Sequence, residues 1–170
     1  MAELFTTHGL PEPGSLGATL SQGLPDGYFV VERPTVEGHD LDAVVLGAQG
    51  LFVLVTRNWT GEIEPTEHGD WRVRLPSGDE GSYPNPKRAV QQAEAALRAF
   101  LKDDFPALQP AIHSLLVLTD PDASVVAEIP PELPTVTTAG VVVAIESVPA
   151  LPKTDLPDQA QREALAIAIC

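Results

Sequence analysis

Two apolar stretches separated by a short glycine-containing turn constrain the fold of this chain more than any other feature. Residues 41–47 and 50–57 are both rich in Val and Leu, and Gly47 and Gly50 flank the turn between them. Side chains alternate between the two faces of a strand, and in this pair both faces are largely apolar. The pattern therefore predicts a β-hairpin at the centre of a sheet whose two faces are covered by other elements.

Length and composition are those of one globular domain. The chain has 170 residues, of which 44% are hydrophobic, so it is long enough to bury a core. No apolar run approaches the roughly 18 residues of a membrane span, and the N-terminus lacks the basic and apolar regions of a signal peptide. The one cysteine, Cys170, cannot form an internal disulfide. We predict a cytoplasmic protein with no membrane partner.

The periodicity of the remaining sequence predicts an α/β fold, with a mixed β-sheet of about five to seven strands flanked by helices. The clearest helix runs from Pro86 to Phe105, with Asn85 as its cap and an apolar stripe that should lie on the sheet. A strand at 112–119 follows, so this helix should connect two parallel strands. Other expected helices lie at 15–22 and 158–169, and other expected strands at 28–33, 62–64, 71–75 and 141–145; residues 77–84 should be a polar loop.

Polar residues at the end of the predicted hairpin form a recognisable pattern. Asp42 lies near the start of the first strand, Val55 and Arg57 share one face of the second, and Asn58-Trp59-Thr60-Gly61 follows directly. This resembles the nuclease-related domain (NERD) family, in which an aspartate is followed on the next strand by Glu-x-Lys and an Asn-Trp-x-Gly turn. Asn85-Pro86 resembles the start of the family's long helix. The resemblance covers roughly residues 14–119 and implies a core like that of restriction endonucleases.

The chemical part of this motif is degenerate. The resemblance implies two carboxylates that hold a divalent ion and a lysine that positions the attacking water. Here the glutamate position is Val55, which has no oxygen, and the lysine position is Arg57, which stays protonated and cannot act as a base. The family's first-helix glutamate should fall at residues 15–18, where there is no acid. The motif predicts a catalytically impaired domain with no cofactor.

Two interpretations of the candidate site residues, Asp42 and Arg57, remain open. Asp42 is equally compatible with a functional carboxylate and with an acid that accepts a hydrogen bond at a strand entry. Arg57 is expected to form an ion pair with Asp42 rather than to act catalytically. The alternative is a Mg- or Mn-dependent DNA or RNA nuclease in which Asp42 binds the metal with a relocated glutamate (Glu62, Glu64 or Glu67) and Arg57 holds the scissile phosphate. A mixed ligand set of Glu37, His39 and Asp40 is a weaker metal hypothesis.

Net charge is the main evidence about partners. Ten basic residues against 24 acidic residues give a formal charge of -14, which disfavours tight nucleic-acid binding. A local basic patch is still possible, formed by Arg57, Arg72, Arg74, Lys87 and Arg88. Trp59 and Trp71 could stack on a base, although core packing is the commoner use of such residues.

The sequence therefore predicts a NERD-like domain at residues 14–150, preceded by a flexible arm at 1–13. Residues 151–170 should form a linker and helix that leads to a possible downstream domain. We expect a scaffold, sensing or interaction module in a nucleic-acid-handling or defence system, with a protein partner or the fused downstream domain as its binding partner. A plain protein-binding module with an acidic surface for a basic partner is a further possibility.

Overall fold

A computed structural model describes residues 1–6, 12–127, 133–150 and 157–170. Its α-helices are α1 (Leu16–Gly23), α2 (Lys87–Asp104), α3 (Val141–Ser147) and α4 (Gln159–Ile169), with a 3-10 turn at Thr138–Gly140. Its strands are β1 (Glu3–Thr6), β2 (Phe29–Glu32), β3 (Thr35–Val36), β4 (His39–Asp40), β5 (Ala43–Gly47), β6 (Gly50–Arg57), β7 (Gly61–Glu64), β8 (Trp71–Arg74), β9 (Glu80–Tyr83), β10 (Ile112–Leu118), β11 (Ala123–Val125) and β12 (Thr135–Thr137). The result is a mixed α/β protein, as predicted.

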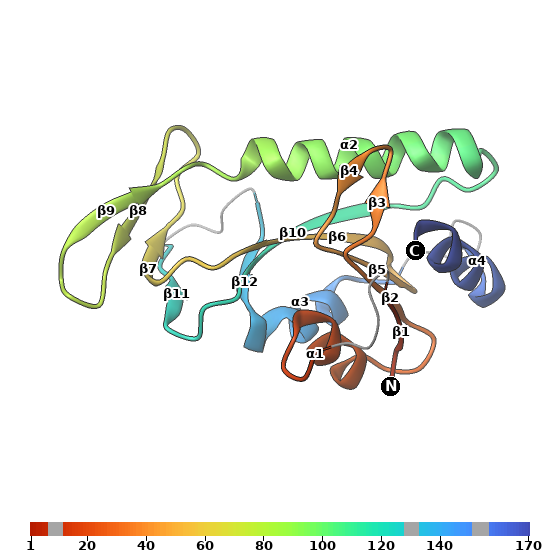
Figure 1. Cartoon of the computed structure of the whole chain (residues 1–170), viewed down its shortest axis with the longest axis horizontal. Coiled ribbons are helices and arrows are strands. Elements are labelled where there is room, and N and C mark those ends of the chain that lie inside the picture. The colour runs from red at the N-terminus through yellow and green to blue at the C-terminus, as the bar shows by residue number, and fades with distance from the viewer. Residues whose placement is uncertain (7–11, 128–132, 151–156) are drawn as a thin grey trace.

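A six-stranded mixed sheet in the order β1-β2-β5-β6-β10-β12 forms the centre of the molecule (Figure 1). The predicted hairpin is its middle: β5 and β6 are antiparallel, with Ala43 opposite Leu54 and Gly47 opposite Gly50. β10 pairs in parallel with β6 along its whole length, from Ile112 opposite Leu51 to Leu118 opposite Arg57. The predicted parallel pairing across the long helix is therefore confirmed.

Helices cover both faces of this sheet, which explains why the hairpin is apolar on both sides. On one face, Val53 and Val55 belong to a core that includes the inner residues of α2 and α4. On the other face, Phe52 and Leu54 belong to a second core with residues of α1 and α3. Figure 1 shows α2 above the sheet and α1 and α3 below it. The alternating side chains of one strand thus supply two separate cores.

A second sheet of four strands, β11-β7-β8-β9, extends the molecule at one end (Figure 1). Its inner face contributes Ile63, Trp71 and Val73 to the α2 core, while the intervening residues of β7 and β8 are exposed. The predicted strands at 62–64 and 71–75 are confirmed. The prediction of a polar loop at 77–84 is wrong for Glu80–Tyr83, which forms β9, because cross-strand pairing with β8 stabilises a strand without an apolar pattern of its own.

Three further segments test the sequence predictions. Residues Glu3–Thr6, expected in a flexible arm, form β1 and pair in parallel with β2, so that expectation is wrong for these four residues; residues 7–11 lie outside the described residues. The predicted strand at 141–145 is also wrong. This valine-rich segment is helix α3, which places Val141 and Ile145 one turn apart in the core. The C-terminal helix is confirmed, and a capping box between Asp158 and Gln161 begins it.

None of the helices in the described ranges combines the length and apolar character needed to cross a bilayer.

Candidate functional site

Asp42 lies one step beyond the last paired residues of the hairpin, Ala43 and Leu54. Its side chain is exposed, and its Oδ2 accepts a hydrogen bond of 2.8 Å from the main-chain N–H of Thr56. The carboxylate therefore takes the place that a main-chain carbonyl would have if the β5–β6 ladder continued. This is the structural role that the sequence left open for Asp42: an acid that closes the end of a sheet.

Val55, at the glutamate position of the motif, is part of the hydrophobic core. Its side chain is only 6% exposed and belongs to the same core as Val53 and the α2 residues Val90 and Leu97. A glutamate at this position would have its carboxylate among aliphatic side chains rather than in water. The structure therefore places a buried apolar side chain at the position where the family motif has its glutamate.

Arg57, at the lysine position, is half-buried at the end of β6. Its guanidinium Nη1 donates a 2.7 Å hydrogen bond to the carbonyl of the preceding residue, Thr56, and its own carbonyl accepts the N–H of Thr119 at 3.0 Å. Within residues 12–127 no ion pair joins Arg57 to Asp42, so the predicted pairing is wrong. Asp42 and Arg57 bind the N–H and the C=O of the same residue, Thr56, instead of each other.

A carboxylate that the sequence did not single out lies beside helix α1. Glu32 ends β2, opposite Ala43, and its half-buried side chain reaches the helix N-terminus, where Oε1 accepts a 3.4 Å contact from the N–H of Gly17. A β-carbon on Gly17 would lie 2.6 Å from Glu32 Oε2. Glu32 thus brings an acid to the helix segment where the resemblance implies one, but from a different element. Only the alignment of β2 with α1 in space reveals it.

The turn after β6 packs against the second sheet through contacts between aromatic side chains. Trp59 stacks on Tyr83 of β9 with ring centroids 4.6 Å apart, and it meets Trp71 of β8 edge-on at 6.0 Å. Trp71 is 2% exposed. Both tryptophans therefore pack within the protein, which confirms the core interpretation and leaves the base-stacking hypothesis without support from their geometry.

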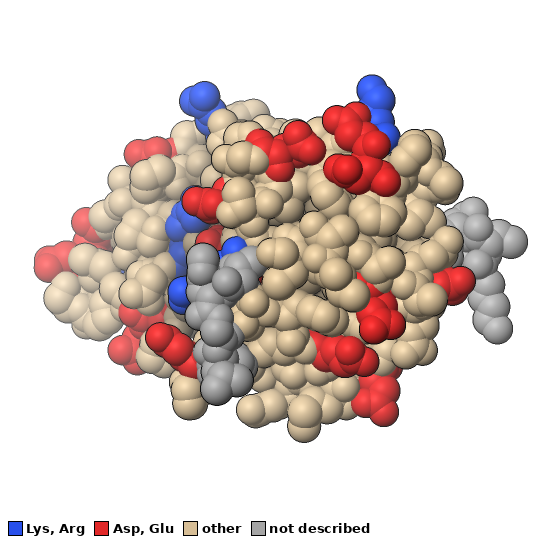
Figure 2. All heavy atoms as spheres, turned by 45° about the vertical axis from the view of Figure 1, so that its right-hand side comes forward, with Lys and Arg blue, Asp and Glu red and all other residues tan. Residues whose placement is uncertain are grey.

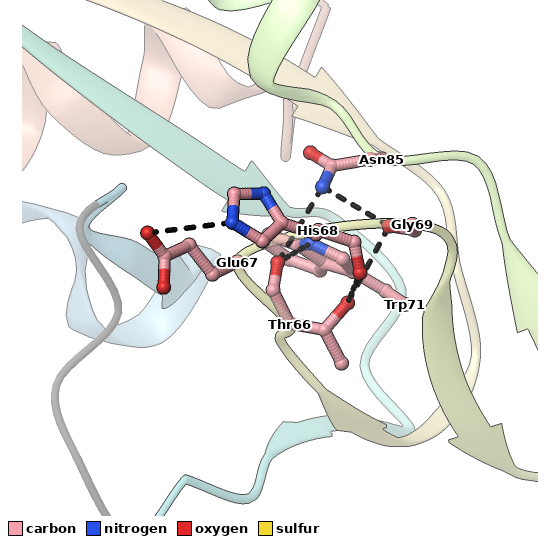
Figure 3. Close-up of polar contacts among 6 residues, drawn as sticks. All are labelled: Thr66, Glu67, His68, Gly69, Trp71 and Asn85. Atoms are coloured by element: carbon pink, nitrogen blue, oxygen red, sulfur yellow. Dashed lines mark hydrogen bonds and ion pairs between the residues drawn. The ribbon is translucent and has the colours of Figure 1, made fainter.

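Asn85 fixes the start of α2 to the loop between β7 and β8 (Figure 3). Its Oδ1 accepts the N–H of Lys87 at 3.0 Å. The N-cap position itself is Pro86, one residue later than predicted, so Asn85 binds the first N–H of the helix from just outside it. Its Nδ2 donates to the carbonyls of Gly69 at 3.1 Å and Thr66 at 3.4 Å. The Thr66 carbonyl also accepts from the indole Nε1 of Trp71. The Asn-Pro motif thus holds the second sheet against the long helix.

Comparison with known protein families agrees with this arrangement of strands and helices. The family model described as nuclease-related domain matches residues 15–119. This chain belongs to the nuclease-related domain family. The match spans the segment that contains Asp42, the hairpin, the tryptophan turn and the Asn85-Pro86 helix start. Searches among curated proteins and among solved structures gave no match.

The residues of this NERD domain do not fit the divalent ion that active members of the restriction-endonuclease type require. No group of three His, Cys, Asp or Glu side chains that could hold a metal ion exists in the described part of the chain. This covers the Glu37, His39 and Asp40 set, in which Asp40 accepts a hydrogen bond from Thr35. Hard cations such as Mg²⁺ need several oxygen ligands at one point.

The three glutamates expected to replace the lost ligand are also elsewhere. Glu62 and Glu64 lie on the exposed face of β7 and pair with Arg74 at 3.9 Å and Arg72 at 2.8 Å. Glu67 is exposed in the loop after β7, 3.8 Å from His68 (Figure 3). None of the ion pairs that these three carboxylates form involves Arg57. The same contacts pair Arg72 and Arg74, two members of the basic patch that the sequence allowed, with carboxylates of β7.

The surface of the NERD domain reflects its net charge. Acidic side chains are spread over the face shown in Figure 2, where Lys and Arg side chains are few. On helix α2, Arg98 donates to Glu94 at 2.7 Å, and Ser114 of β10 donates to the other oxygen of Glu94 at 3.0 Å. The hydrogen bond from Arg98 outweighs partial burial and holds the pKa of Glu94 below its usual range. This cluster connects helix α2 to strand β10.

Proposed function

We propose that this NERD domain is a catalytically inactive interaction module that works in a nucleic-acid-handling or defence system. The observation that carries the proposal is the burial of Val55: the position of the metal-binding glutamate is 6% exposed and packed with α2. The remaining motif residues, Asp42 and Arg57, are engaged with the main chain of Thr56. The scaffold of the family is kept and Asp42 is present, but the glutamate ligand is replaced by Val55.

A protein partner, or a further domain fused to this one, is the binding partner that we propose. The formal charge of -14 opposes close approach to phosphate backbones and favours a basic protein surface. A cytoplasmic location belongs to the same proposal, because a chain with one cysteine has no internal disulfide to maintain.

The experiment that tests inactivity combines metal binding with cleavage. Purified protein is titrated with MnCl₂ by calorimetry and incubated with single- and double-stranded DNA and RNA in Mg²⁺ or Mn²⁺. We expect no saturable heat of metal binding and no cleavage above that of an Asp42→Ala control prepared in parallel. Cleavage that depends on the metal and disappears in Asp42→Ala would contradict the proposal.

One observation favours the alternative of a metal-dependent nuclease. Glu32, the last residue of β2, places a carboxylate beside Gly17 of α1 and lies opposite Ala43, the residue after Asp42. A nuclease of this kind would lose its activity equally in Glu32→Gln and Asp42→Ala. The matched control is Glu62→Gln, which changes an exposed glutamate on β7 that pairs with Arg74 and should leave activity unchanged.

A further inference from the structure

Helix α2 has an outer face that is exposed along its whole length. Arg88, Ala95, Ala99 and Lys102 follow one another at spacings of seven, four and three residues, so they lie along one line of the helix. All four are exposed, and Figure 1 shows α2 along the outside of the molecule, above the sheet. The two alanines leave the middle of this outer face without long side chains.

The charges at the two ends of α2 are arranged against the helix dipole. Lys87 and Arg88 stand in the first turn, where the dipole favours acids, and this turn contains no acid. Asp103 and Asp104 stand in the last turn, where the dipole favours bases, and Lys102 is the one base there. The reverse order of charges would stabilise the helix within a single chain. The observed order therefore needs a reason outside the isolated chain.

The charges at the two ends of α2 are too far apart to pair with each other within one chain. Fifteen residues separate Arg88 from Asp103, which corresponds to about 22 Å along a helix. Among the described residues, no ion pair involves Arg88, Asp103 or Asp104, and all three are exposed. Glu94 and Arg98, one turn apart in the middle of α2, do pair at 2.7 Å. Opposite charges for the helix ends are therefore available from another molecule.

A second copy of α2 that runs in the opposite direction supplies both of these charges at once. A two-fold axis across the helix produces this direction and makes the contact the same for both copies. With the alanines at the crossing point, Ala95 lies level with Ala99 of the second copy, and Arg88 lies within about 5 Å of Asp103 along the helix axis. Lys102 lies level with the uncharged Gln92. Each basic end thus meets an acidic end, whereas parallel helices would bring like charges together.

The distribution of charge over the chain also favours α2 for contact between two copies. Residues 87–104 include four of the ten basic residues but only three of the 24 acidic residues. Two copies with a formal charge of -14 each repel one another, although salt at physiological concentration screens exposed charges that are more than about 8 Å apart. A contact through α2 keeps most of the acidic residues outside this distance from the second copy.

We propose that the outer face of α2 binds α2 of a second copy in the antiparallel direction, so that this NERD domain forms a two-fold symmetric dimer. Arg88 of each copy pairs with Asp103 and Asp104 of the other copy. Ala95 and Ala99 allow the two helix axes to approach closely. One pair of helices is a small interface, so the dimer is weak and reversible. This inference goes beyond the proposed function, because the dimer forms whether or not the motif residues bind a metal.

Charge reversals at opposite ends of α2 test this contact. Arg88→Glu and Asp103→Lys each place like charges together in the dimer, and each should weaken self-association by about tenfold or more in sedimentation equilibrium. Both changes improve the match to the helix dipole, so neither should lower the Tm. Asp103→Lys also makes the chain less negative, so weaker association of this variant cannot result from repulsion between the whole chains.

Mixing the two variants tests the antiparallel direction. In a mixed dimer, the introduced glutamate meets the introduced lysine at one end, and the native Arg88 meets the native Asp103 at the other. We expect the mixture to associate as strongly as the wild-type protein. Ala95→Glu, at the crossing point, should also weaken association by about tenfold or more. Its matched control is Ala160→Glu, which adds the same charge at an exposed alanine of α4 and should leave association unchanged.

A wild-type protein that stays monomeric from micromolar to millimolar concentration would overturn the inference. So would charge reversals without effect, a mixture that stays monomeric, or equal effects of the two alanine variants. The cleavage assay on the same preparation separates this inference from the proposed function. Metal-dependent cleavage by a dimer removes the proposed function alone, and an inert monomer removes the dimer alone.

Discussion

Replacement of Val55 by glutamate restores the acid of the family motif and tests whether the old site is still able to accept it. Burial of a valine side chain contributes about 1.5–3 kcal/mol, and Val55 is 6% exposed. A carboxyl in its place must also be protonated or desolvated, and each unit by which burial raises its pKa costs about 1.4 kcal/mol at neutral pH. With a shift of about two units, Val55→Glu should lower the free energy of unfolding by about 4–6 kcal/mol.

Thermal unfolding followed by circular dichroism measures this change. For a domain of this size, the loss corresponds to a Tm lower by about 8–24 °C at pH 7. The introduced carboxyl has a raised pKa in the folded state, so its penalty is absent below its unfolded pKa of about 4.3 and grows as the pH rises above it. The deficit should therefore be much smaller at pH 4 than at pH 7.

The control places the same substitution on the surface. Val143 of α3 is 68% exposed, and Val143→Glu should change the stability by less than about 0.5 kcal/mol. The motif-restored double variant, Val55→Glu with Arg57→Lys, should remain unable to cleave DNA or RNA, and Mn²⁺ should not raise its Tm. A Val55→Glu protein as stable as the control, or one that Mn²⁺ stabilises, would refute the argument that this position is closed to water and metal.

Three further predictions follow from single contacts. Asp42→Ala should lower the free energy of unfolding by about 0.5–1.5 kcal/mol, because a strand N–H loses its acceptor, and Asp42→Asn should recover most of this in urea titrations. Glu94→Gln should lower the free energy of unfolding by about 0.5–1 kcal/mol at pH 7. Because Arg98 keeps the pKa of Glu94 low in the folded state, the difference in stability between the two proteins should disappear as the pH falls through that pKa. A constant difference in stability down to pH 2 would contradict a stabilising Glu94–Arg98 contact. Gly61→Ala should cost about 2 kcal/mol or more in the same titrations, because Gly61 has φ +94° and an added β-carbon would lie 2.5 Å from the Arg74 carbonyl oxygen; a neutral effect would show that this turn relaxes.

Local patterns predicted the elements whose stability comes from their own residues. The hairpin and the long helix are correct because alternation and helical periodicity act within a few residues, and the predicted start of the helix is one residue early. The predictions failed at β1 and at α3. A valine-rich segment such as 141–145 has high strand propensity, but burial of Val141 and Ile145 against the sheet requires a helix there. Tertiary packing outweighs propensity at such positions.

The candidate site also has features that the sequence predicts and features that depend on tertiary structure. The sequence by itself determined that an aliphatic residue, Val55, stands where an oxygen ligand is required, because the chemistry of a side chain does not depend on its surroundings. Only the tertiary structure decided that Asp42 binds the Thr56 N–H instead of Arg57, and that Glu32 reaches α1. Contacts between residues distant in the chain depend on how strands and helices are placed in space, because this placement decides which hydrogen-bond donors lie within reach of a carboxylate.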